Sequence, residues 1–228
     1  MRPISFQDGN VLLFYGDSIT DAMRERESGI DLGNGFVRMI AAYLRYTRPD
    51  MFIKIFNRGV AGDSIHDLTA RMEEDCLKLR PDVVSILVGV NDATYRAWLH
   101  GDPAPLAAED FEKHGRILIK GIRRENPKVQ IIISTPYLCE TTREHRTNKR
   151  QLKEYIPIIT RLAEEYGCAL IPLHEIMDRE KEAGRAALWL EDGVHPTPAG
   201  TLFLAEAWIW HVLGERWMNG GHQGKNGI

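Results

Sequence analysis

The sequence predicts an α/β fold, with one parallel sheet covered by helices on both faces. Five short apolar runs occur along the 228 residues, and segments with helical spacing lie between them. Continuously apolar runs are typical of strands covered on both faces of a parallel sheet. Strands that alternate with helices build such a sheet from βαβ units. The sequence has no linker rich in proline, glycine or serine, so we expect one domain over residues 1–219 and a flexible tail over 220–228.

The predicted strands are the five apolar runs. Four of the runs are continuously apolar, whereas the second, "FIKIF", alternates. In chain order the runs cover residues 11–15, 52–56, 83–88, 129–134 and 169–173.

The predicted helices place apolar residues three and four positions apart, which gives each helix one apolar face. Ser64 and Thr197 are suitable N-cap residues, and Pro198 suits a first helical turn. Gly167 is a suitable residue to end a helix. The predicted helices cover residues 35–46, 64–79, 109–125, 153–167 and 197–217.

Composition argues against several classes of function. The net charge of −3 comes without a basic block, so we expect no nucleic-acid partner. The apolar runs are too short to span a bilayer, so we expect no membrane partner. The N-terminal segment "MRPISFQDGN" does not resemble a signal peptide, and the three cysteines form no C-x-x-C pair. We therefore expect reduced cysteines, no zinc site and a cytoplasmic location.

The residues that follow the predicted strands carry the chemistry. In open α/β sheets, ligands bind beyond the carboxyl ends of the strands. Gly16-Asp17-Ser18 follows the first strand, "NRGVAGDS" the second and "GVND" the third, and "EDGVHP" precedes the last helix. These segments are therefore expected to meet at one edge of the sheet.

Together these segments hold the groups that a serine hydrolase needs. Ser18 can act as the nucleophile, and His195 can accept its proton. Asp192, three residues earlier, can hold the imidazole in one tautomer. The backbone N–H groups of Ser18 and Gly62 and the side-chain amide of Asn91 can donate hydrogen bonds to an oxyanion.

Each of these residues also has a purely structural interpretation. Ser18 could cap a helix, Gly62 could form a tight turn, and Asn91 could form an Asx-turn. Asp192 and His195 could be an ion pair at the start of a helix.

A second histidine competes with His195 for the role of base. His174 follows the fifth strand and has Glu175 beside it. No carboxylate lies three residues before it in a turn, so His195 is favoured.

Four sequence blocks resemble those of the SGNH hydrolases, also called the GDSL esterase superfamily. The blocks are "GDSITD", "NRGVAG", "GVND" and "DGVHP", and they occur in the family's order. The resemblance implies a flavodoxin-like three-layer α/β/α sandwich with a central parallel sheet of five strands. It also implies catalysis by Ser18, Asp192 and His195, an oxyanion hole from Ser18, Gly62 and Asn91, and no metal or organic cofactor. The G-x-S-x-G motif of ordinary α/β-hydrolases is absent.

The loops around the predicted site favour a polar substrate. Segments 23–35, 92–105 and 137–148 are charged and polar, with a few aromatic residues. Within the superfamily, "ALWLEDGVHP" and the sequence around "GDSITD" resemble bacterial carbohydrate and xylan acetylesterases. We therefore expect removal of acetyl groups from sugar or xylo-oligosaccharide esters. The alternatives are a lysophospholipase or thioesterase, or a carbohydrate-binding protein without turnover.

Four residues are candidates for substrate contact: Asp17, Tyr95, Trp98 and Tyr137. For Asp17, support of its loop is the alternative.

The last predicted helix carries apolar residues on more than one face, including Trp208 and Trp210. Part of it is expected to bury against a second copy of the chain.

Overall fold

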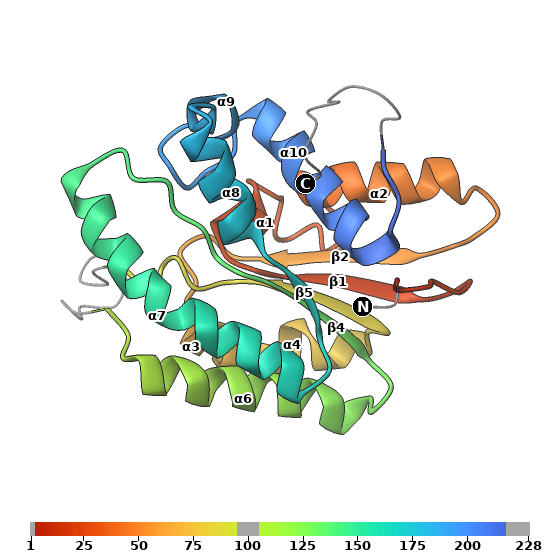
Figure 1. The fold of residues 1–228 in the computed structure, drawn as a ribbon. Coiled ribbons are helices and arrows are strands. Elements are labelled where there is room, and N and C mark those ends of the chain that lie inside the picture. The colour runs from red at the N-terminus through yellow and green to blue at the C-terminus, as the bar shows by residue number, and fades with distance from the viewer. Residues whose placement is uncertain (1–2, 95–104, 218–228) are drawn as a thin grey trace.

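The computed structural model describes residues 3–94 and 105–217. Its centre is a five-stranded parallel sheet with the order β2-β1-β3-β4-β5. Helices form a layer on each face of this sheet (Figure 1). The predicted three-layer α/β/α class is therefore confirmed, and the strand order is the flavodoxin-like one. The expected tail over 220–228 and the end of the expected domain lie outside the described residues.

The five strands lie close to the apolar runs that predicted them. They are β1 (Val11–Gly16), β2 (Lys54–Gly59), β3 (Val83–Leu87), β4 (Gln130–Ser134) and β5 (Ala169–Ile171).

The helices divide between the two faces (Figure 1). On one face lie α3 (Ile65–Ala70), α4 (Met72–Asp75), α6 (Ala108–Glu125) and α7 (Arg143–Glu165). On the other lie α1 (Ser18–Asp21), α2 (Phe36–Thr47), α8 (Leu173–Glu182), α9 (Ala186–Trp189) and α10 (Pro198–Leu213). A short 3₁₀ helix, η1 (Leu77–Leu79), follows α4.

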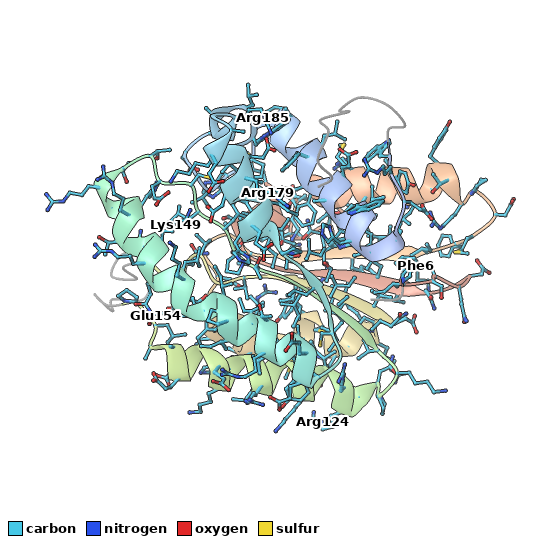
Figure 2. The ribbon with its side chains drawn as sticks, viewed as in Figure 1. Phe6, Arg124, Lys149, Glu154, Arg179 and Arg185 are labelled. Atoms are coloured by element: carbon cyan, nitrogen blue, oxygen red, sulfur yellow. The ribbon has the colours of Figure 1, made fainter. Side chains whose placement is uncertain are left out.

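Alternate residues of β1 build the two apolar layers. Leu12 and Phe14 belong to the cluster that includes α2 and α10, whereas Leu13 and Tyr15 belong to the cluster that includes α3, α6 and α7. Side chains fill the space between sheet and helices, while charged residues such as Arg124 and Arg185 lie on the outside (Figure 2). Burial on both faces explains why β1 is continuously apolar.

Two strands differ from their predicted bounds by more than one residue. β2 begins at Lys54, where pairing with Val11 starts, and it continues to Gly59. The buried Asn57 near its end is tolerated because its side-chain amide donates to the carbonyls of Thr20 and Leu32. β5 stops at Ile171 because Pro172 has no N–H to donate and is followed directly by α8.

The helix predicted over 64–79 is broken into three pieces. α3 ends at Arg71, whose φ of −99° and ψ of 8° depart from helical values. The Thr69 hydroxyl donates to the carbonyls of Ile65 and His66, which also perturbs the last turn of α3.

The other helices differ mainly at their ends. α7 begins ten residues before the predicted start at 153, because Thr142 caps it by accepting the His145 N–H and its first turns are polar and escape the apolar pattern. α10 ends at Gly214, whose φ of 69° lies in the left-handed region. α8 and α9 were not predicted.

The three cysteines are buried and free. Among the described residues, the helices are too short or too polar to cross a membrane.

Close backbone contact joins the end of β2 to α1. A Cβ atom added to Gly59 would lie 2.2 Å from the backbone nitrogen of Asp21. We therefore expect Gly59→Ala to lower the free energy of unfolding by about 1–3 kcal/mol, the usual cost of overpacking. Urea unfolding measures this change. Gly121→Ala, within α6, is the control, because the methyl group added there meets only the flexible end of the Met72 side chain. Equal stability of the two variants would contradict the tight β2–α1 contact.

Candidate active site

The first strand places Ser18 at the carboxyl edge of the sheet. β1 ends at Gly16, and Asp17 caps the four-residue helix α1 by accepting the Ile19 N–H at 3.0 Å through Oδ1. Ser18 is the first residue of α1, where a backbone N–H has no partner within the helix. The serine hydroxyl and its own N–H therefore lie at the same rim.

His195 stands between Ser18 and Asp192. The Ser18 Oγ lies 3.0 Å from His195 Nε2, and His195 Nδ1 lies 2.6 Å from Asp192 Oδ2. With the proton on Nδ1, the imidazole donates to the carboxylate and presents a lone pair on Nε2 to the hydroxyl. A base at this distance can take the serine proton directly.

The Asp192 carboxylate is held by its own loop. Its Oδ1 accepts the backbone N–H groups of Val194 and His195, both at 2.8 Å. Partial burial by itself raises the pKa of Asp192, but the hydrogen bonds from the His195 ring and from these two N–H groups outweigh burial and lower it. Asp192 therefore stays ionised and can stabilise a protonated His195.

The segment that carries this pair is anchored at both ends. Leu190 and Pro196 form an antiparallel bridge, which closes the loop. The Cys139 N–H donates to the Gly193 carbonyl at 2.9 Å, and the Thr141 hydroxyl donates to the Asp192 carbonyl at 3.1 Å. These contacts dock the loop on the segment that follows β4.

The candidate oxyanion donors come from the next two strand ends. Gly62 lies in the turn closed by the Asp63 N–H to the Val60 carbonyl, and its φ of +88° favours glycine. The Asn91 side-chain amide donates to the Asp63 carbonyl at 2.9 Å. An amide nitrogen carries two hydrogens, so a second donor remains on Asn91.

The structure brings together the serine, histidine and aspartate that the sequence singled out. His174 is not at this site; its Nδ1 lies 2.8 Å from the Thr135 hydroxyl, at the start of α8. Tyr95 and Trp98, expected to contact substrate, lie outside the described residues.

Two other residues expected to contact substrate are buried. The side chains of Asp17 and Tyr137 are each 1% exposed. Neither lines the pocket beside Ser18. This corrects the expectation of substrate contact and favours the alternative for Asp17, support of the nucleophile turn.

An open pocket with a volume of about 680 Å³ lies beside Ser18 and His195. Its lining combines polar and charged side chains with apolar ones, which include Ile19, Met23 and Phe36. Met23 is 90% exposed and adopts a φ of 59°, which is unusual for a residue with a side chain. The polar lining residues include Arg26, Asn34, Glu191 and Thr201.

Sequence reasoning missed these lining residues individually. Arg26 and Asn34 belong to the charged segment 23–35, which was recognised only as a polar loop. Glu191 precedes Asp192 directly, so its nearness to the site could have been inferred from spacing alone. No group of three or more potential metal ligands is present among the described residues.

A hydroxyl, an imidazole and a carboxylate in line, at the carboxyl edge of a parallel sheet, define a serine hydrolase of the α/β class. The family of GDSL-like lipases and acylhydrolases matches residues 14–201. The chain belongs to this family.

Several relatives resemble the chain over nearly its whole length. An acetylxylan esterase of Geobacillus stearothermophilus is 31% identical in an alignment of 218 positions that covers 92% of this chain and 96% of that protein. Axe2, an acetylxylan esterase of the same organism, has been solved as catalytic mutants that replace a serine, a histidine or an aspartate by alanine. Those structures have a TM-score of 0.81 and 29% identity, and the match covers 96% of this chain and all of theirs.

A third relative is LAE5, an α/β hydrolase from the metagenome of Lake Arreo. Its structure has a TM-score of 0.78 and 31% identity, over 91% of this chain and 96% of that one. The fold is thus shared with enzymes whose names describe hydrolases.

The buried Asp17 predicts a pH-dependent stability. Burial raises the pKa of Asp17 from 3.8 to about 7, although the Ile19 N–H and His195 act in the opposite direction. An acid with a raised pKa contributes stability that is present at low pH and is lost as the pH rises through about 7. Asp17→Asn cannot ionise, so its free energy of unfolding relative to the wild type should rise between pH 5 and pH 8, by on the order of 2 kcal/mol.

Urea unfolding at the two pH values measures this difference. Asp50→Asn, at an exposed position, is the control and should show no such change. The raised pKa is contradicted if Asp17→Asn and the wild type keep the same difference in stability at both pH values.

Proposed function

We propose that the protein is a serine esterase that removes acetyl groups from carbohydrate esters such as acetylated xylo-oligosaccharides. The observation that carries this proposal is the continuous line from Ser18 Oγ through His195 to Asp192, with contacts of 3.0 and 2.6 Å, at the edge of an open pocket. The similarity to acetylxylan esterases over more than nine-tenths of the chain supports the choice of substrate.

The first half of the reaction forms an acyl-enzyme. Ser18 Oγ attacks the ester carbonyl carbon while its proton passes to His195 Nε2, and Asp192 stabilises the imidazolium. The backbone N–H groups of Ser18 and Gly62 and the Asn91 amide donate to the carbonyl oxygen as it gains negative charge. The tetrahedral intermediate then expels the sugar alkoxide, which takes the proton from His195.

The second half releases the acid. A water molecule gives a proton to His195 Nε2 and attacks the acyl carbon, and the same donors hold the second oxyanion. Collapse of this intermediate frees acetic acid and returns the proton to Ser18 Oγ. The side chain of His195 is 48% exposed, so alcohol and water can both reach it from solvent.

The polar side chains in the pocket lining support a sugar ester as substrate. Arg26, Asn34, Glu191 and Thr201 offer donors and acceptors for hydroxyl groups, and the volume of about 680 Å³ is typical of a small-ligand site. Ile19, Met23 and Phe36 add apolar surface to the same pocket, which suits a small acyl group.

The association of two copies through α10 stays a prediction, as does the cytoplasmic location. The substrate itself is a small-molecule or oligosaccharide ester in this proposal.

A panel of substrates tests the proposal. The wild type should release acetate from acetylated xylo-oligosaccharides and should cleave p-nitrophenyl acetate much faster than the octanoate. Ser18→Ala should lower kcat by at least about 10³-fold on every substrate, because the nucleophile is removed. Ser5→Ala, at an exposed position, is the matched control and should keep full activity.

Two outcomes would count against the proposal. Faster cleavage of the octanoate, with acetylated sugars left intact, would favour a lysophospholipase or thioesterase. Equal rates for the wild type and Ser18→Ala would favour a carbohydrate-binding protein without turnover.

A further inference from the structure

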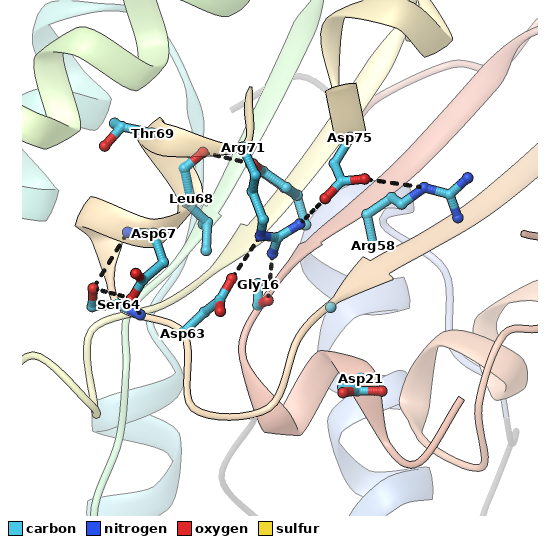
Figure 3. A network of polar contacts seen from close by, with 12 residues as sticks. Gly16, Asp21, Arg58, Asp63, Ser64, Asp67, Leu68, Thr69, Arg71 and Asp75 are labelled. Carbon is cyan, nitrogen blue, oxygen red and sulfur yellow. Dashed lines mark hydrogen bonds and ion pairs between the residues drawn. The ribbon is translucent and has the colours of Figure 1, made fainter. Parts of the chain in front are cut away.

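Arg71 lies at the centre of a polar network behind the candidate active site (Figure 3). Its Nε donates to Asp63 Oδ2 at 2.6 Å, its Nη1 to Asp75 Oδ2 at 2.9 Å, and its Nη2 to the Gly16 carbonyl at 3.2 Å. The Arg71 side chain is 18% exposed, and its guanidinium lies 4.4 Å from the centre of the Tyr15 ring. The end of β1, the loop that contains Asp63 and helix α4 therefore share one cation.

The hydrogen bond from Arg71 to the Gly16 carbonyl reaches the turn that carries the proposed nucleophile. The Gly16 carbonyl ends β1, two residues before Ser18. The same carbonyl also accepts the N–H of Val60 at 3.0 Å, from the loop that contains Gly62. The Gly16 carbonyl thus ties the end of β1 to the Gly62 loop, and Arg71 completes its hydrogen bonding.

The hydrogen bond from Arg71 to Asp63 bears on the other two proposed oxyanion donors, Gly62 and Asn91. Asp63 follows Gly62 directly, and its N–H closes the turn that contains Gly62 by donating to the Val60 carbonyl, so holding the Asp63 side chain restrains the backbone of that turn. The Asp63 carbonyl accepts the Asn91 amide at 2.9 Å. The position of Asn91 therefore depends on Asp63, and Asp63 depends on Arg71.

Charge and geometry suit an arginine at this position. The Asp63 side chain is 12% exposed, and a carboxylate so far from water needs a charged partner. The planar guanidinium offers five N–H donors in a rigid fork, whereas a lysine offers one compact charge. Asp75 holds the far side of the fork and also lies 3.9 Å from Arg58.

We propose that Arg71 is a positioning residue that sets the oxyanion hole, because its guanidinium holds both the Gly16 carbonyl before Ser18 and the Asp63 side chain that fixes Gly62 and Asn91. This inference rests on the proposed esterase function. Arg71 does not touch the substrate. It acts through the backbone and side-chain groups that do.

The chain contains a matched control for this assignment. Arg116 on α6 pairs with Glu112 at 2.9 Å and with Glu165 at 2.5 Å, and its guanidinium lies 5.9 Å from the ring of Tyr166. Like Arg71, Arg116 therefore contacts two carboxylates and a tyrosine ring, but it does so on the outer helical layer. Loss of Arg116 reports what such a network contributes to stability alone.

Steady-state kinetics with p-nitrophenyl acetate test the proposal. Arg71→Lys and Arg71→Met should lower kcat by about 10- to 100-fold, as expected when oxyanion donors are misplaced, and should change KM by less than about threefold. Arg116→Lys and Arg116→Met should keep the wild-type kcat. Wild-type kcat in both Arg71 variants would overturn the assignment.

Binding of phenylboronic acid gives a readout that a purely structural role would not change. Its adduct with Ser18 is tetrahedral and presents an oxygen to the oxyanion hole, unlike the ground-state ester. The inhibition constant should rise in the Arg71 variants in parallel with the fall in kcat. An unchanged inhibition constant beside a lowered kcat would also overturn the assignment.

A double-mutant cycle with Asn91→Ala tests the route of the effect. Because Arg71 acts partly through Asn91, the double variant Arg71→Lys/Asn91→Ala should lose less activity than the product of the two single losses. Losses that multiply independently would contradict the link through Asp63. If Arg71→Met does not fold, the cycle with Arg71→Lys still decides.

Failure of the proposed function has a different signature. In that case the wild type itself would show no esterase activity that Ser18→Ala removes. Failure of the Arg71 assignment instead leaves an active wild type, an inactive Ser18→Ala variant and unaffected Arg71 variants.

Discussion

The parallel pairing of β1 with both of its neighbours is the constraint on which the site depends. Gly16 pairs with Gly59 of β2 on one side and with Leu87 of β3 on the other. In a parallel sheet all carboxyl ends face the same edge, so the loops after these three strands begin at one level. Ser18, Gly62 and Asn91 follow within a few residues of that level. A slip of one strand would separate Ser18 from Gly62 and Asn91, the candidate oxyanion donors.

Sequence patterns predicted the parts of the molecule that repeat simple physical rules. Apolar runs buried on both faces revealed the strands, and four short blocks located Ser18, Gly62, Asn91, Asp192 and His195. The pair Asp192 and His195 was accessible because its geometry is set within one turn. The distance from Ser18 to His195 was not accessible, since 177 residues separate them and only the completed sheet brings them together.

The parts that sequence missed depend on contacts between distant residues. Nothing in the pattern of residues 64–79 shows that the helix breaks at Arg71, because the break follows from partners as far away as Gly16. Asp17 looked available for substrate, but the surrounding helices and strands bury it. The site therefore combines an exposed row of reacting groups with a buried layer of charged and polar groups behind it. Local sequence patterns predict the reacting groups but not the buried layer behind them.

The loop that carries Asp192 and His195 has a consequence for how the protein responds to heat. Its closure depends on the Leu190–Pro196 bridge and on a few hydrogen bonds to the segment after β4, whereas no strand of the sheet passes through it. Small units with few buried contacts open at a lower free energy than the whole domain. When this loop opens, His195 and Asp192 move away from Ser18 together, while the sheet remains intact. We therefore expect thermal inactivation of this protein to have a lower midpoint than its melting.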